Sequence, residues 1–152
     1  MTDTPTTFES RDMMNVVGYQ MTARASQLAY QTPGIGPEDI DVVEAYDDYP
    51  VVCVFQIEDL GFCAKGEGPE FIRRHSFEAN GSFPFNTSGG QLSVGQAGAA
   101  GGTLGMVEAI RQVTGQAIGA QVENARHALV SGYGMINFDR GLCSGAAILA
   151  AT

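Results

Sequence analysis

The sequence is poor in the side chains that bind metals or form disulfides. It has three cysteines, two histidines and no tryptophan. The cysteines are odd in number, and no Cys or His spacing is typical of zinc ligation. We therefore expect no bound metal and no disulfide framework, as in a protein of a reducing compartment.

Basic residues are also scarce. Eight Lys and Arg stand against 17 Asp and Glu, which gives a formal net charge of −9. Such a chain is not attracted to a phosphate backbone, so a nucleic-acid partner is not expected. Long apolar runs are missing, and the start MTDTPTTFES lacks the apolar segment of a signal peptide. We expect a cytoplasmic protein without a membrane partner.

The composition is otherwise that of a folded protein. The 152 residues are 44% hydrophobic and only 16% charged, which argues against disorder. This length suits one domain with one sizeable core. Residues 1–11 predict a mobile, polar N-terminus, and residues 12–152 predict the single domain.

The hydrophobic pattern predicts a layered α/β fold. The predicted helices cover residues 12–31, 48–60 and 103–113, and the predicted strands cover residues 39–46, 128–134 and 144–151. Residues 61–85 predict an irregular segment, residues 85–102 a glycine-rich loop, and residues 135–143 the loop of an antiparallel hairpin. For residues 48–60 a strand is the competing interpretation, because β-branched side chains are frequent there. Asp48 is the expected N-cap of that helix.

The segment NTSGGQLSVGQAGAAGG, residues 86–102, carries many of the 20 glycines. Glycines before a helix allow backbone N–H groups to approach an anionic or carbonyl oxygen. The segment is not a Walker A loop, since no Gly-Lys-Ser/Thr follows, and no strand precedes it as in a dinucleotide fingerprint. Tight packing of helix on sheet, without chemistry, is the alternative interpretation.

Three segments in the same order resemble the second half of a thiolase. The loop at residues 86–102 is similar to the thiolase pattern N-x-x-G-G…G-H-P-x-G-A-x-G. The segment VEAYDDY at residues 43–49 is similar to the thiolase segment whose sequence is N-E-A-F or H-D-C-F. The closing ALVSGYG…CSGAAILA resembles the strands around the C-x-G motif. The chain is therefore identified as a relative of the thiolase superfamily, in the branch of the lipid-transfer (sterol-carrier) thiolases and the aldolases of steroid side-chain breakdown.

The resemblance implies a fold and a partner. The expected fold is the C-terminal half of a thiolase-like layered structure, with a mixed sheet and packed helices. The first half of the family's chain and the first strand of the second half are expected to be absent. The chain is then a separate subunit or a fragment, and an N-terminal thiolase-like half or second subunit is the expected partner. An OB-fold zinc-ribbon protein is a further partner that the resemblance implies.

The departures from the family define the candidate site. Gln96 stands where the family has His, Tyr133 where C-x-G has Cys, and Tyr46 where the first motif has Asn or His. A phenol can donate and accept a proton, and Asp47 can tune Tyr46 or act itself. The predicted catalytic residues are thus Tyr46, Asp47, Gln96 and Tyr133, although strand-end tyrosines can also simply pack. The loop supplies the predicted substrate-binding residues Asn86, Gly89, Gly90, Gly95 and Gly98.

The cysteines do not replace the missing nucleophile in this interpretation. Cys143 lies in CSG, which imitates C-x-G, but the first closing strand precedes the family motif. Cys143 is therefore expected to be a small core residue at a strand start, and Cys53 and Cys63 are expected to be structural.

Three functions stay open at this stage. The first is an aldolase-type C–C lyase, because a retro-aldol on a bulky β-hydroxyacyl-CoA needs a base and enolate-stabilising donors but no covalent cysteine. The second is a non-catalytic structural or regulatory subunit. The third is an acyltransferase whose nucleophilic cysteine lies on a partner chain. Coenzyme A is expected only as part of the substrate, with no other cofactor, and the protein is expected to be oligomeric.

Overall fold

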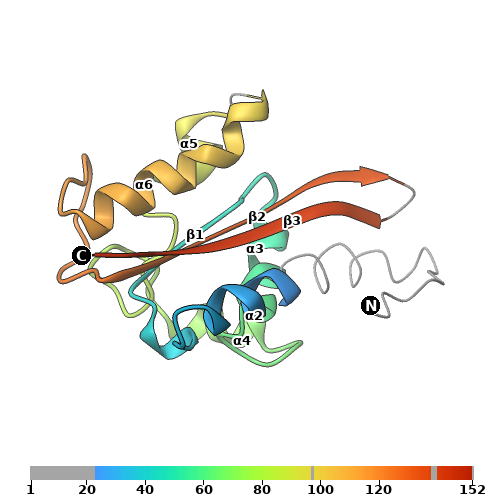
Figure 1. Ribbon diagram of the computed structural model, residues 1–152, viewed down its shortest axis with the longest axis horizontal. Helices are drawn as coiled ribbons and strands as arrows, with labels where there is room; N and C mark the ends of the chain where they lie inside the picture. Colours follow the sequence, from blue (N-terminus) through green and yellow to red (C-terminus); the bar gives the residue numbers. More distant parts are fainter. Residues whose placement is uncertain (1–22, 97, 138–139, 152) are drawn as a thin grey trace.

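The computed structural model describes residues 23–96, 98–137 and 140–151. Within them a three-stranded mixed sheet lies between two helical layers (Figure 1). This confirms the predicted α/β layered fold. The predicted mobile segment 1–11 and the first part of the helix expected at residues 12–31 lie outside the described residues.

The sheet is built from β1 (Val42–Ala45), β2 (His127–Asn137) and β3 (Arg140–Ala150), in the order β1-β2-β3. β1 and β2 are parallel, with Ala45 opposite Ser131, while β2 and β3 are antiparallel. The closing hairpin is longer than expected. Much of the segment predicted as its loop, residues 135–143, continues the strand ladder instead, because every residue there except 138 and 139 belongs to β2 or β3.

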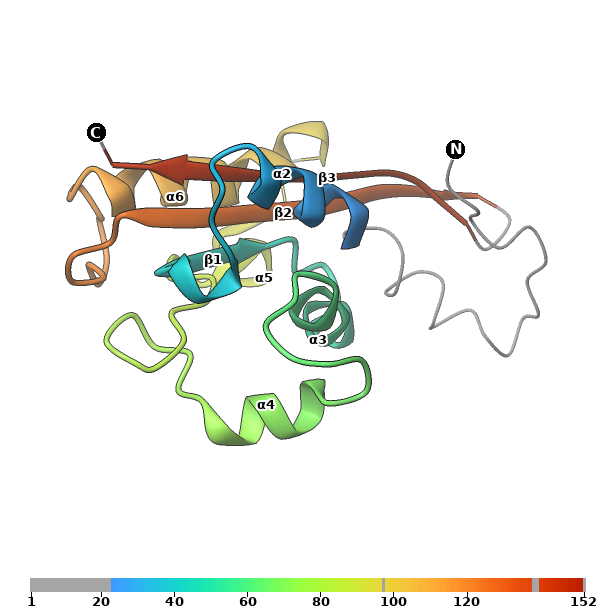
Figure 2. The same ribbon diagram turned by 60° about the horizontal axis from the view of Figure 1, so that its bottom comes forward.

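Side chains alternate between the two faces of the sheet, as strand geometry requires. Val42 and Val130 belong to one apolar cluster together with Ala109 of α6 (Leu104–Val113). Val43 and Leu129 belong to the cluster on the opposite face. There they meet side chains from α2 (Ala23–Gln31), from α3 (Pro50–Asp59) and from the neighbourhood of α4 (Gly68–Arg74). Figure 2 shows α6 and the α2–α3–α4 group on opposite sides of the strands.

Several elements follow directly from the sequence. α2 ends at Gln31, and Gly34 adopts a left-handed φ of 71° just beyond it, which closes the helix. Pro50 opens α3 at a position where no N–H is needed, so helix rather than strand is confirmed there. The helix expected at residues 103–113 is present as α6.

Other predictions were wrong in detail. The strand expected at residues 39–46 is shortened to β1, because Pro37–Asp39 forms a 3-10 turn, η2. The segment 61–85 contains α4, which has Pro69 in its first turn. The glycine-rich loop contains α5 (Gly90–Val94) and the 3-10 helix η3 (Gly98–Thr103). Asp48 is not the N-cap of α3, since Tyr49 occupies that position and no side chain caps the helix.

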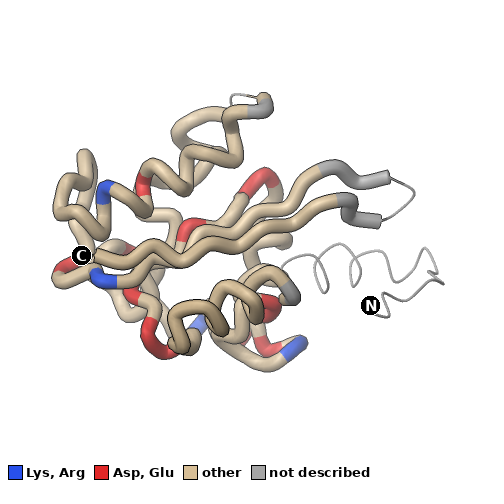
Figure 3. Tube along the Cα trace, viewed as in Figure 1, with Lys and Arg blue, Asp and Glu red and all other residues tan. Residues whose placement is uncertain are grey.

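Charge is distributed unevenly over these elements. Figure 3 shows the described parts of β2 and β3 as an uncharged pair through the middle of the molecule, with acidic positions on β1, loops and helices around them. The acidic positions at the end of β1 are Glu44 within the strand and Asp47 and Asp48 just after it.

Candidate active site

The candidate site forms where β1 ends beside β2. Tyr46 follows the last residue of β1, and its N–H donates to the carbonyl oxygen of Ser131 at 3.1 Å. This places Tyr46 beside Gly132, where an added Cβ would lie 3.9 Å from the Tyr46 Cβ. Tyr133 is the next residue of β2, and the two rings meet edge to face with centroids 5.4 Å apart. Parallel pairing thus brings together two tyrosines that are 87 positions apart in the sequence, from 46 to 133.

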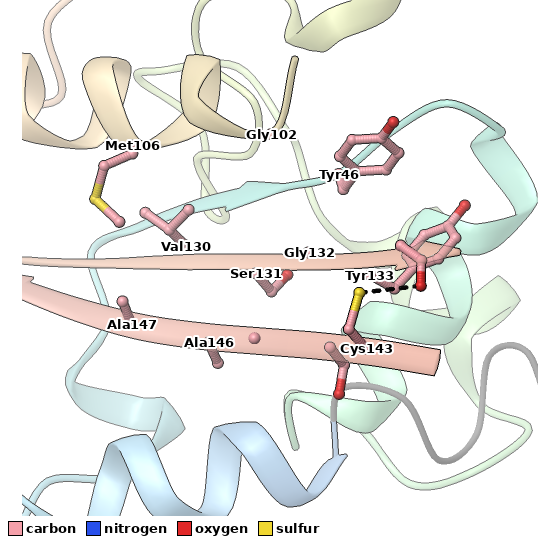
Figure 4. A pocket seen from close by; sticks show the side chains of 13 residues that line it. Tyr46, Gly102, Met106, Val130, Ser131, Gly132, Tyr133, Cys143, Ala146 and Ala147 are labelled. Carbon is pink, nitrogen blue, oxygen red and sulfur yellow. Dashed lines mark hydrogen bonds between the residues drawn. The ribbon is translucent and has the colours of Figure 1, made fainter. Parts of the chain in front are cut away.

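An open pocket of about 500 Å³ lies along the adjoining part of the sheet. Tyr46 and Tyr133 line one end of it, and Met106 of α6 lines it further along β2 (Figure 4). Small residues of β2 and β3 form its floor, among them Gly132 and Ala146. The lining contains no charged side chain, so the pocket suits an apolar group of substantial size.

Gln96 reaches this site through Tyr46. Its Nε2 donates a hydrogen bond to the Tyr46 hydroxyl oxygen. Gln96 is not among the residues that line the pocket itself. The structure therefore places Gln96 behind Tyr46, where it can orient the phenol.

Tyr133 has a different partner. Its hydroxyl donates to Oδ1 of Asp48, which lies on the turn between β1 and α3. Burial raises the pKa of Tyr133 above its usual range, and the carboxylate of Asp48 raises it further. Tyr133 is therefore a neutral phenol at physiological pH. Asp48 was not predicted as a site residue, because its position before Pro50 indicated a helix N-cap.

Asp47 is turned toward the glycine-rich segment. It is buried, and its Oδ1 accepts the backbone N–H of Gln91 at 2.7 Å. A Cβ on Gly90 would lie 2.0 Å from Oδ2 of Asp47, so only glycine fits there. Asp47 thereby fixes the start of α5. It lines a narrow crevice next to the main pocket rather than the pocket itself.

The predicted substrate-binding residues mostly hold the loop in place. Oδ1 of Asn86 accepts the N–H of Ala45 at 2.8 Å, and the Asn86 N–H donates to Val43, which ties the loop to β1. Gly89 precedes α5 with a φ of 94°, Gly95 ends α5, and Gly98 begins η3. None of these residues lines the main pocket, and their role in substrate binding stays a prediction.

Cys143 does not match its predicted environment. It is exposed and lines the main pocket, and its thiol donates to the carbonyl oxygen of Gly134 at 3.1 Å (Figure 4). The expectation of a core residue at a strand start was wrong because β3 begins earlier, at Arg140. Cys53 of α3 is half-buried, and burial raises the pKa of its thiol to about 12.

A buried acid pair, Glu44 of β1 and Glu108 of α6, lies next to the site. Oε1 of Glu44 accepts the Thr87 hydroxyl at 2.8 Å, and the same hydroxyl lies 3.0 Å from Oε1 of Glu108. One hydroxyl hydrogen cannot serve both carboxylates, so a proton on Glu44 completes the arrangement. Burial is the main cause that raises the pKa of Glu44 to about 7.

Metal-binding clusters and membrane-spanning helices are both missing from the part of the chain that the structure describes. Its residues contain no group of three or more His, Cys, Asp or Glu side chains placed to hold a metal ion. The same described residues form no helix that is long and apolar enough to cross a membrane.

Comparison with known proteins identifies the fold family. The family model "Thiolase C-terminal domain-like" matches residues 3–143. The chain belongs to this family. This thiolase-like chain is 34% identical to sterol carrier protein 2 of Rattus norvegicus over 135 residues, which are 89% of the chain and 25% of the relative. It is 36% identical over 118 residues to the 17-hydroxy-3-oxo-4-pregnene-20-carboxyl-CoA lyase of Mycobacterium tuberculosis, covering 78% of the chain and 28% of that protein.

A solved structure shows the same relationship. The Ltp2-ChsH2(DUF35) aldolase superposes with a TM-score of 0.71 and 32% sequence identity, over 86% of this thiolase-like chain and 31% of the other. The chain thus spans about a quarter to a third of the lengths of these proteins. The predicted resemblance to the thiolase superfamily and to its sterol-carrier and steroid aldolase branch is confirmed.

Proposed function

We propose that this chain forms part of an aldolase-type C–C lyase that cleaves a bulky β-hydroxyacyl-CoA. The observation that carries the proposal is the meeting of Tyr46 and Tyr133 at one end of a large uncharged pocket. A retro-aldol needs a group that takes the proton of the β-hydroxyl and a group that returns a proton to the α-carbon. Two phenols with different hydrogen-bond partners suit this pair of tasks.

The reaction balances without a covalent intermediate. The β-hydroxyl loses its proton as its oxygen becomes a ketone, and the bond between the α- and β-carbons breaks. The electron pair of that bond passes to the α-carbon and the thioester oxygen as an enolate. Protonation of the α-carbon then gives a shorter acyl-CoA. No histidine lines the pocket among the described residues, so the base that activates the cysteine of an acyltransferase has no counterpart there.

The size and polarity of the pocket favour a bulky acyl group. The wall formed by Met106, Val130 and the small residues of β3 offers an apolar surface to a rigid hydrocarbon skeleton. A lyase whose name specifies a steroid-type acyl-CoA is among the relatives, which supports a steroid side-chain intermediate as substrate. The coenzyme A part would be a portion of this substrate rather than a separate cofactor.

We further propose that the activity requires a partner. The chain corresponds to about a quarter of the length of sterol carrier protein 2, and the name of the solved aldolase joins Ltp2 to ChsH2(DUF35). An N-terminal thiolase-like half or second subunit would cover the open side of the pocket. An OB-fold zinc-ribbon protein as an additional partner rests on the family resemblance alone.

The test is a cleavage assay on the chain purified together with an N-terminal thiolase-like subunit as its partner. The probe is 17-hydroxy-3-oxo-4-pregnene-20-carboxyl-CoA, and the products are followed by mass spectrometry. We expect a steroid ketone and a shortened acyl-CoA, formed without added coenzyme A. An acyltransferase would instead require free coenzyme A and lose activity with a thiol reagent. A complex that forms but cleaves neither this probe nor other β-hydroxyacyl-CoA thioesters would point to the non-catalytic role.

A further inference from the structure

The feature that this function leaves unused is the carboxylate of Asp48. Asp48 stands two residues after Tyr46 on the turn from β1 to α3, where a cap for the helix was expected. α3 starts with Pro50 and has Tyr49 as its N-cap without a side-chain bond. The carboxylate of Asp48 therefore does not cap the helix, and it accepts the hydroxyl hydrogen of Tyr133.

The two tyrosines consequently present different groups to a ligand. The single hydroxyl hydrogen of Tyr133 is directed at Asp48, so the Tyr133 oxygen has only lone pairs to offer. The Tyr46 oxygen accepts from Gln96, and no described residue takes its hydroxyl hydrogen in turn. Tyr133 is thus arranged to accept a proton, and Tyr46 is arranged to donate one.

We propose that Asp48 is the positioning residue of the site, which orients Tyr133 and receives its proton when Tyr133 takes the proton of the substrate's β-hydroxyl. This inference rests on the proposed aldolase function. In the step, the substrate O–H bond breaks and a new O–H bond forms on Tyr133, while the original Tyr133 O–H bond breaks and its proton moves to Asp48. The electron pair of the substrate O–H bond becomes the ketone π bond as the carbon–carbon bond breaks.

The surroundings explain why the phenol needs this help. A phenol oxygen that keeps its own proton is a very weak base, so Tyr133 can take the substrate's proton only as it gives up its own. Phenols ionise only near pH 10 in water, so Tyr133 does not lose that proton unaided at neutral pH. Burial makes the Tyr133 phenolate still less favourable. Passing the proton on to a carboxylate avoids forming that buried phenolate. The neighbouring acceptor Asp47 is already engaged with Gln91, and Cys53 is held as a neutral thiol, so Asp48 is the available acceptor beside Tyr133.

A purely structural role for Asp48 makes a different prediction. In that case the hydrogen bond only tethers the Tyr133 ring, and any acceptor of similar shape would serve. Asp48→Asn provides such an acceptor, because its amide oxygen can still receive the hydroxyl hydrogen but cannot take up the proton. The activity of D48N therefore distinguishes the tethering role of Asp48 from its role as proton acceptor.

The experiment compares D48N, D48E and the control E70Q with the wild type, each in complex with the partner subunit, using 17-hydroxy-3-oxo-4-pregnene-20-carboxyl-CoA. E70Q also removes one negative charge, but Glu70 is paired with Arg73 and Arg74 on the surface of α4. We expect D48N to lower kcat by about 100-fold or more with KM changed less than about twofold, the typical size of lost general-base assistance. The kcat of D48E should be at least about tenfold higher than that of D48N, and the kcat of E70Q should equal that of the wild type.

The outcomes decide between the alternatives. A D48N complex with near-wild-type kcat overturns this inference and leaves the aldolase function standing. A wild-type complex that cleaves neither this probe nor other β-hydroxyacyl-CoA thioesters overturns both. Melting temperatures of the complexes show whether D48N has folded. If it has not, D48E replaces it as the deciding variant: retained activity supports the carboxylate, and activity as low as that of Tyr133→Phe overturns it.

Discussion

At the scale of single residues, the proposed chemistry depends on two phenolic hydroxyl groups. Tyr46→Phe and Tyr133→Phe each remove one hydroxyl and keep the ring, so the edge-to-face contact survives. We expect each variant to lower kcat by roughly 100-fold or more, because one proton transfer loses its group. Stability should fall by only about 1 kcal/mol for the lost hydrogen bond. Steady-state kinetics and melting curves measure both effects. Full activity in either variant would show that its tyrosine takes no part in proton transfer.

The sequence predicted part of this site and missed part of it. Tyr46, Gln96 and Tyr133 were predicted because each replaces a residue of a recognisable thiolase motif, and the structure brings their side chains together. Asp48 was missed because an Asp two residues before a Pro is typical of a helix N-cap. Whether such a side chain caps the helix or bonds to Tyr133 is decided by the pairing of β1 with β2. Such a long-range contact leaves no local pattern in the sequence.

At the scale of elements, the start of α5 depends on the absence of a side chain at Gly90. Its φ is 66°, and a Cβ would collide with Asp47. We expect Gly90→Ala to destabilise the protein by about 1–3 kcal/mol, since the new methyl group meets a buried carboxylate in a left-handed conformation. Gly119→Ala is the matched control, because no atom lies within 4 Å of its added Cβ. Urea unfolding of both variants measures the difference, and equal stabilities would contradict this role of Gly90.

The buried pair of Glu44 and Glu108 predicts a pH dependence of stability. The folded chain holds a proton on Glu44 up to about pH 7, whereas the ordinary pKa of this group is 4.5. Between these values the folded state binds more protons than the unfolded state, so stability falls as the pH rises. We expect the titration of Glu44 to lower the free energy of unfolding by about 2–3 kcal/mol between pH 5 and pH 8.

The control for this prediction is Glu44→Gln, which keeps the side chain's shape and hydrogen-bonding capacity without titrating. Urea unfolding at pH 5 and pH 8 should show a smaller loss of stability in Glu44→Gln than in the wild type. An equal pH dependence in both proteins would show that Glu44 is already ionised when folded.

The elements also show what local patterns can predict. α2, α3 and α6 carry apolar residues at helical spacing and begin or end at Pro or Gly, and these helices were predicted. α4 and α5 are short, with seven and five residues, and their sequences GPEFIRR and GQLSV have little amphipathic pattern. Contacts from outside the helix stabilise their first turns: Glu58 accepts the N–H of Gly68, and Asp47 accepts that of Gln91.

At the scale of the whole molecule, the outer face of α5 and α6 remains apolar. Leu92 and Val94 of α5 and Ile110 of α6 are exposed at 59%, 56% and 46%, and Ile118 in the segment after α6 is exposed at 79%. Soluble proteins rarely leave such a group uncovered. This supports the proposal that another chain covers part of the structure.

We therefore expect the isolated chain to self-associate or to fold poorly. Sedimentation and thermal melting in dilute solution measure this directly. Val107→Lys, on the outer face of α6, should weaken association with the partner, whereas Ile72→Lys on α4 is a control of similar exposure. A cooperatively melting monomer that persists at nanomolar concentration would show that the chain needs no partner.

The central claim is that this chain takes part in aldol cleavage by proton transfer. It is tested most directly by turnover of 17-hydroxy-3-oxo-4-pregnene-20-carboxyl-CoA in heavy water by the complex with its partner. The enolate formed on cleavage must take its proton from groups that exchange with solvent, such as the hydroxyls of Tyr46 and Tyr133. We predict a ketone and a shortened acyl-CoA that carries one solvent deuterium at its α-carbon. Absence of the ketone, or an acyl-CoA product without deuterium, would contradict the claim.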